Sequence, residues 1–105
     1  MSNLPHCYLT AICNANRTEA ISYIEERIQK HGTLLDFNLF SDLSLALVME
    51  IPGEQISVLI QELKTMLQFD KNPEISQNNL YQLYLNITFT QGKGELRHSI
   101  PEVPG

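Results

Sequence analysis

The order of the hydrophobic segments constrains the fold of this chain more than any other feature. Four segments carry the alternating or continuous apolar pattern of β-strands, and two carry apolar residues at the spacing of one helix face. Along the chain they read strand, helix, strand, strand, helix, strand. In that order, the segments are Cys7–Cys13, Arg17–Lys30, Leu34–Phe40, Leu43–Ile51, Glu54–Phe69 and Leu80–Thr90.

This order predicts an α+β domain with the ferredoxin-like fold. Two strand–helix–strand halves form a βαββαβ sandwich, a four-stranded antiparallel sheet with both helices on one face. We expect a single domain over residues 1–105 with its core in 7–90, because the length suits one unit. Residues 91–105 are expected to hold an extra strand at Glu95–Ile100, paired as a hairpin or with a neighbouring subunit, and then a loose end. Because this fold serves many functions, it does not identify one by itself.

Two cysteines lie six residues apart on the first strand segment. At about 3.3 Å per residue they are separated by roughly 20 Å, which is too far for a disulfide within one chain. The even spacing places Cys7 and Cys13 on one face with Leu9 and Ala11. We therefore expect two buried, reduced thiols.

The first helix segment has a signal at each end. Asn16 is a favourable N-cap, and Glu19 follows it at the spacing of a capping box. His31 suits the negative C-terminal end of the helix, and Gly32 suits a left-handed C-cap. The second helix is expected to continue as far as Phe69.

The apolar strand segments predict self-association. Leu43–Ile51 is almost wholly apolar, so both of its faces need a cover. The helices supply one cover, and another subunit is a candidate for the other. An exposed edge at Leu34–Phe40 or Leu80–Thr90 also invites pairing between chains. We therefore expect a homodimer or a higher oligomer.

The charge balance disfavours nucleic acid as a partner. The net charge is −5, and the lysines and arginines form no stripe that could follow a phosphate backbone. These residues are Arg17, Arg27, Lys30, Lys64, Lys71, Lys93 and Arg97. No apolar run is long enough to cross a membrane, and the first residues lack the pattern of a signal peptide. We expect a cytoplasmic protein without a membrane partner.

The chemistry that related folds carry is poorly represented here. Copper transfer needs a C-x-x-C pair in the first loop, and Cys13 has no second cysteine at that spacing. RNA recognition needs aromatic and basic residues on the central strands, and Leu43–Ile51 has neither. Arg17 and Asn38 resemble the arginine and asparagine of acylphosphatases, but the glycine-rich phosphate cradle is missing.

The histidines are not spaced as metal ligands. His6, His31 and His98 stand apart from other ligand types at helical spacing, and Glu25 and Glu26 fit a solvated helix face. We expect no metal, no cofactor and no catalytic residues.

Several of these segments together resemble an ACT domain. The matching stretches lie within residues 7–90, and the phrase Ile28-Gln29-Lys30-His31-Gly32 fits the family's helix end well. Where the family has an Asp-Arg-Pro-Gly-like turn, this chain has Asn16-Arg17-Thr18-Glu19, without the glycine. The resemblance implies a small stand-alone regulatory domain that binds an amino acid and pairs its strands across subunits.

Three functions follow as hypotheses. The first is a ligand-binding regulatory module, with Asn14, Asn16, Arg17 and Thr18 at the positive end of the first helix, where a carboxylate is favoured. The second is a protein-interaction or assembly module that uses strand edges and the apolar sheet face. The third is a small ferredoxin-like enzyme, for which the sequence offers no acid–base pair.

Overall fold

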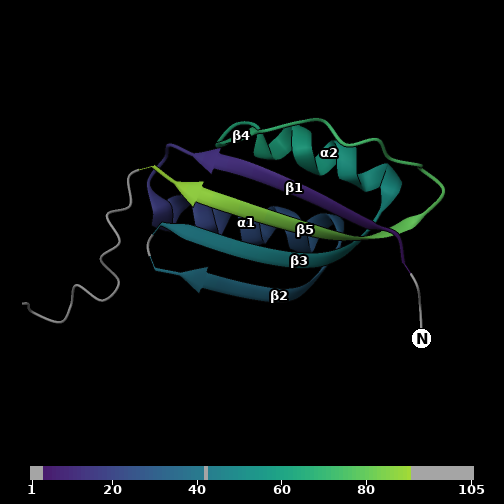
Figure 1. Ribbon diagram of the computed structural model, residues 1–105, viewed down its shortest axis with the longest axis horizontal. Coiled ribbons are helices and arrows are strands. Elements are labelled where there is room, and N and C mark those ends of the chain that lie inside the picture. The colour runs from purple at the N-terminus through teal and green to yellow at the C-terminus, as the bar shows by residue number, and fades with distance from the viewer. Residues whose placement is uncertain (1–3, 42, 91–105) are drawn as a thin grey trace, which may run out of the picture.

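The computed structural model describes residues 4–41 and 43–90 (Figure 1). It contains two helices and a five-stranded sheet, so the predicted α+β class is confirmed. The elements are β1 (His6–Cys13), α1 (Arg17–His31), β2 (Thr33–Phe40), β3 (Ser44–Pro52), α2 (Gly53–Leu63), β4 (Leu67–Phe69) and β5 (Leu80–Phe89).

The sheet is mixed, and its strand order is β2-β3-β5-β1-β4. The prediction of four antiparallel strands is therefore wrong. β5 lies between β3 and β1, antiparallel to β3 and parallel to β1, with Tyr8 opposite Tyr84. β5 comes from Leu80–Thr90, one of the two segments that were predicted to form an exposed edge. It lies instead at the centre of the sheet, where its backbone bonds to a strand on either side. The edge beside β1 belongs to the short strand β4.

β4 was not predicted, because its residues continue the helical spacing of α2. The helix ends at Leu63, the chain turns with the Met66 amide donating to the Leu63 carbonyl at 2.9 Å, and Leu67–Phe69 pairs with β1. No glycine or proline separates Leu63 from Phe69, so the sequence has no helix-breaking signal there. Leu67 is buried in either arrangement, as its apolar side chain requires.

Both helices pack on one face of the sheet and enclose a single hydrophobic core (Figure 1). On β1 the residues alternate between buried and exposed, as predicted, with Cys7 and Cys13 on the buried face. Both thiols are free. Burial raises the pKa of the Cys7 thiol, which favours the protonated, unreactive form.

The two ends of α1 differ in how well the sequence predicts them. The Glu19 amide donates to Asn16 Oδ1 at 3.1 Å, which confirms the N-cap. Gly32 is extended, with φ −157°, so the expected left-handed C-cap is wrong. The glycine is needed for space instead, because a Cβ there would lie 2.6 Å from the Glu50 carbonyl oxygen on β3.

The opposite face of the sheet carries no helix, and we call it the open face (Figure 1). It presents the side chains of β1, β5, β3 and β2 that point away from the core. Tyr8 and Phe40 are the most exposed large residues on it, at 60% and 57%. The predicted subunit cover for this face stays a prediction.

Two further expectations concern the ends of the chain and the membrane. The predicted strand Glu95–Ile100 lies outside the described residues. Among the described residues, no helix is both long and apolar enough to cross a membrane.

Candidate functional site

The four residues predicted to bind a ligand lie at the turn from β1 into α1. Asn16 uses its side-chain oxygen to cap the helix. The Thr90 hydroxyl donates to Asn14 Oδ1 at 2.8 Å, which ties the end of β5 to this turn. Thr18 is exposed and Arg17 is half-buried. Asn14 also lines a hollow, which is described below.

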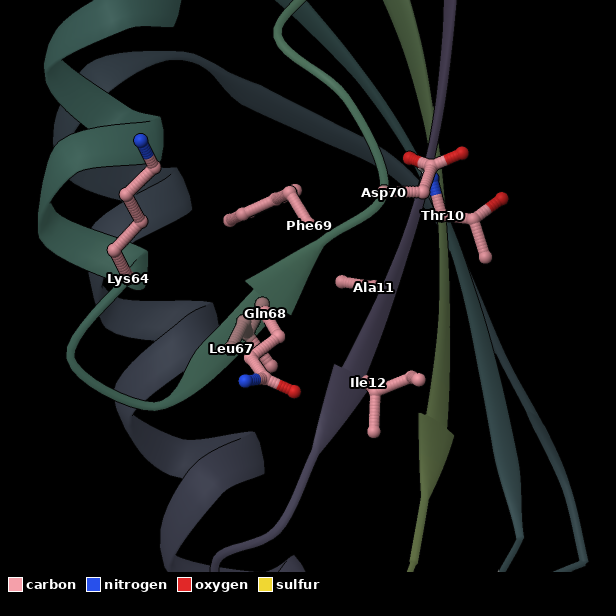
Figure 2. Close-up of a pocket in the computed structure, with 8 residues that line it drawn as sticks. All are labelled: Thr10, Ala11, Ile12, Lys64, Leu67, Gln68, Phe69 and Asp70. Carbon is pink, nitrogen blue, oxygen red and sulfur yellow. Dashed lines mark hydrogen bonds between the residues drawn. The ribbon is translucent and has the colours of Figure 1, made fainter.

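A larger hollow runs along β4, and we call it the β4 groove (Figure 2). Its volume is about 530 Å³. It is lined by Thr10, Ala11, Ile12, Lys64, Leu67, Gln68, Phe69 and Asp70. A neighbouring hollow of about 370 Å³ shares Lys64, Leu67 and Gln68 with it and includes Asn14. The predicted turn therefore borders the neighbouring hollow through Asn14 and contributes no residue to the β4 groove.

Pairing between β1 and β4 fixes one side of this groove. The Asp70 amide donates to the Thr10 carbonyl at 3.0 Å, and the Thr10 amide donates to Asp70 Oδ1 at 3.2 Å. These two bonds hold the Asp70 carboxylate where β4 ends. Lys64 is the C-cap residue of α2, and the chain turn after it places the ammonium group on the other side.

Figure 2 shows Lys64 and Asp70 on opposite sides of Phe69. The groove therefore presents a positive group, an apolar surface and a negative group in succession. In the described part of the chain, neither charged side chain forms an ion pair with another residue. Sequence reasoning missed both residues, because Lys64 was placed within a helix and Asp70 in a polar loop.

The lining side chains include one basic and one acidic group, Lys64 and Asp70. They contain no histidine, no cysteine and no pair of carboxylates for acid–base work. Residues 4–41 and 43–90 also contain no cluster of three or more potential metal ligands.

A second polar cluster joins the two helices. His31 Nδ1 lies 2.7 Å from Gln55 Oε1, and His31 Nε2 lies 3.0 Å from Glu62 Oε1. Arg27 Nη1 approaches the same Glu62 oxygen at 3.5 Å. Tyr23 donates its hydroxyl to the Glu62 carbonyl at 3.0 Å. The sequence signal was the four-residue spacing of Tyr23, Arg27 and His31 on one helix face.

His31 lies at the centre of this cluster. Both of its ring nitrogens are within hydrogen-bond distance of a side-chain oxygen, one from Gln55 and one from Glu62. Its hydrogen bond to Glu62 is the main reason that the pKa of Glu62 is lowered, and the nearby positive charges act in the same direction. The cluster is a link between helices, and none of its residues lines the β4 groove.

We expect Glu62→Gln to remove a contribution to the free energy of unfolding that the parent protein loses in acid. Because the pKa of Glu62 is lower in the folded chain, the unfolded chain takes up a proton first as the pH falls. The stabilisation is fully present above the usual value of 4.5 and is lost below it, as the pH falls through the folded-state pKa. Urea unfolding of both proteins at a series of pH values measures this effect.

The difference in unfolding free energy between the parent and Glu62→Gln should shrink as the solution becomes acidic. Glu26→Gln is the matched control, since Glu26 is exposed on α1 and its substitution removes no such contact. A gap that stays constant through acid pH would contradict the assigned role of Glu62.

Comparison with protein-family models, curated proteins and solved structures found no match for this chain.

Proposed function

We propose that this chain is a non-catalytic binding module whose β4 groove takes a small zwitterion of the amino-acid type. The observation that carries the proposal is the arrangement of Lys64 and Asp70 on either side of an apolar surface (Figure 2). It keeps the ligand class that the ACT resemblance implies and moves the main site from Arg17 and its neighbours to β4.

The chemistry of the lining supports this ligand class. The Lys64 ammonium complements a carboxylate, and the Asp70 carboxylate complements an ammonium group. Because Phe69 lies between the two residues, a ligand that meets both carries its two charges at opposite ends rather than on one carbon (Figure 2). Asp70 Oδ1 already accepts the Thr10 amide, which leaves the second carboxylate oxygen for a ligand. Phe69 and Ile12 supply apolar contact for a ligand side chain.

The finer fold assignment is also a proposal. If β5 were removed, β1 would be the neighbour of β3, and the order would be β2-β3-β1-β4 with every neighbouring pair antiparallel. That is the strand order of a ferredoxin-like sheet, with Leu67–Phe69 as the fourth strand in place of the predicted Leu80–Thr90. We propose that the domain is a ferredoxin-like, ACT-like unit with one additional strand inserted at its centre.

A thermal-shift screen of the full chain against the twenty amino acids tests the ligand. A ligand present at one hundred times its Kd stabilises the folded state by about 2.7 kcal/mol, which raises Tm by several degrees. Lys64→Met and Asp70→Asn should each weaken binding at least about tenfold, the effect of losing one charged hydrogen bond. Lys71→Met is the matched control, because Lys71 is exposed and does not line the groove.

The outcomes separate the possible sites. Binding that survives Lys64→Met and Asp70→Asn but is lost in Arg17→Ala would place the ligand at the predicted turn and contradict the β4 groove. No shift with any amino acid would contradict the ligand class. Light scattering on the same samples tests the homodimer, which a monomer at micromolar concentration would exclude.

The second candidate function is a protein-interaction module. The exposed aromatic residues of the open face favour it.

A further inference from the structure

The two central strands of the open face carry an aromatic cluster. Tyr8 on β1 and Tyr84 on β5 are opposite each other in register, and their rings stack with centroids 4.7 Å apart and an interplanar angle of 12°. His6 meets the Tyr84 ring edge-on at 5.3 Å. Tyr8 is 60% exposed, so the cluster presents an aromatic surface to solvent.

The acidic side chains that the described strands contribute to this face are Asp36 on β2 and Glu50 on β3. The register places Glu50 opposite Gln82, one side-chain row from Tyr84 on the same face, and Asp36 in the row of Tyr84 itself. No lysine or arginine lies on the described strands. The described basic residues lie on α1, after α2 and in the loop that follows β4, at Arg17, Arg27, Lys30, Lys64 and Lys71.

We propose that the open face binds an arginine-bearing segment of another protein. A guanidinium group stacks on an aromatic ring and is attracted by its π-face, and it also pairs with carboxylates. An aromatic ring and a carboxylate, the two groups that bind a guanidinium, lie within two neighbouring rows of side chains on the open face. This inference does not depend on the β4 groove.

The negative charges of the open face argue against a second copy of this chain and against nucleic acid as the molecule bound there. A second copy packed on this face would bring two sets of Asp36 and Glu50 together with no lysine or arginine on the described strands to balance them. Nucleic acid would meet carboxylates where its phosphates need lysine or arginine. A cationic partner alone gains from the charge of the face.

The contacts of β2 indicate that the partner lies on the face rather than along the sheet edge. Asp36 Oδ1 accepts the amide of Phe37 at 3.0 Å, and Asp36 Oδ2 accepts from Asn38 at 2.8 Å. The Phe89 amide donates to the Leu43 carbonyl, so odd-numbered residues along β3 bond to β5 and even-numbered ones bond to β2. Asp36 and Asn38 are opposite even-numbered residues, so they bond to β3 and the Phe37 amide points outward. The edge amide is thus occupied, which disfavours the addition of a strand there.

The test measures binding of three fluorescent peptides to the full chain by anisotropy. The peptides are Gly-Arg repeats, Gly-Lys repeats and Gly-Glu repeats of equal length. We expect the arginine peptide to bind, the lysine peptide to bind several times more weakly because it lacks the planar stacking group, and the glutamate peptide not to bind. Binding should weaken as the salt concentration rises.

Variants assign the binding to the open face. Tyr8→Leu and Tyr84→Leu keep apolar bulk, remove the hydroxyl and the π-face, and should each weaken binding of the arginine peptide by about three- to tenfold. Glu50→Gln should weaken it by about threefold or more. Glu54→Gln is the matched control, because Glu54 is an exposed carboxylate on α2. Circular dichroism establishes that each variant keeps the fold.

Several outcomes would overturn the proposal. Equal losses in Glu50→Gln and Glu54→Gln would mean attraction to net charge alone. Equal affinity for the arginine and lysine peptides, unchanged in the tyrosine variants, would exclude stacking. A dimer that dissociates in Tyr8→Leu would assign the face to a second copy, and binding of a uridine oligonucleotide that Tyr84→Leu abolishes would assign it to RNA.

Discussion

Replacing Phe89 by alanine should lower the free energy of unfolding by about 3–5 kcal/mol. Phe89 is the largest of the fully buried side chains, with 1% of its surface exposed. Its ring lies near the end of β5, between β3 and β1, so truncation removes apolar contact and leaves a cavity beneath the helices. Urea or guanidinium unfolding followed by circular dichroism measures the change.

Phe40→Ala is the matched control for this experiment. The substitution is chemically identical, but Phe40 lies on the open face and is 57% exposed. Its loss should cost less than about 1 kcal/mol, as is usual for surface positions. Equal costs at the two positions would contradict the burial of Phe89 and the assignment of the open face.

Gly53→Ala should lower the free energy of unfolding by about 1–3 kcal/mol, the usual cost of overpacking. A Cβ at this position would lie 2.2 Å from the Ser76 carbonyl oxygen and 3.1 Å from Ile75 Cγ2. The Gly53 amide donates to the Asn79 carbonyl at 2.7 Å, so the same residue anchors the loop that leads into β5. The added methyl group must therefore displace the loop backbone at Ser76, although the amide of the same residue is hydrogen-bonded to that loop at Asn79.

Glu54→Ala is the control for the Gly53 experiment, because Glu54 is the next residue of α2 and is exposed. Chemical denaturation should place this variant within about 0.5 kcal/mol of the parent. A Gly53→Ala variant as stable as the parent would mean that the loop yields without loss, and the close packing of the loop against α2 would then be wrong.

The sequence predicted most elements because each has a local cause. The alternation along β1 identified the buried faces of Leu9 and Ala11, and Asn16 marked the start of α1. No local sequence signal determines the position of β5 in the sheet. Its alternation between buried and exposed residues is the same in a central strand as in an edge strand, and only its pairing with β1 and β3, distant in sequence, decides which it is.

The candidate sites were missed for the same reason. The stacking of Tyr8 on Tyr84 depends on the parallel register of β1 and β5, which no local pattern reveals. Lys64 and Asp70 flank a groove only because the chain reverses after α2 and pairs with β1. Asn14, identified from its place before α1, lines the adjacent hollow because that turn is local.

The central position of β5 also sets the order in which this sheet can assemble. β2 pairs with β3, and β4 pairs with β1, so two partial sheets form from residues that precede β5 in sequence. In the native sheet the two partial sheets are joined only through β5, which lies between them. Such long-range pairing slows folding, because the entropy of closing the chain is lost before the contacts form. During synthesis the complete sheet therefore cannot form until β5 has left the ribosome, since β5 supplies the pairing partner for the inner edges of both halves.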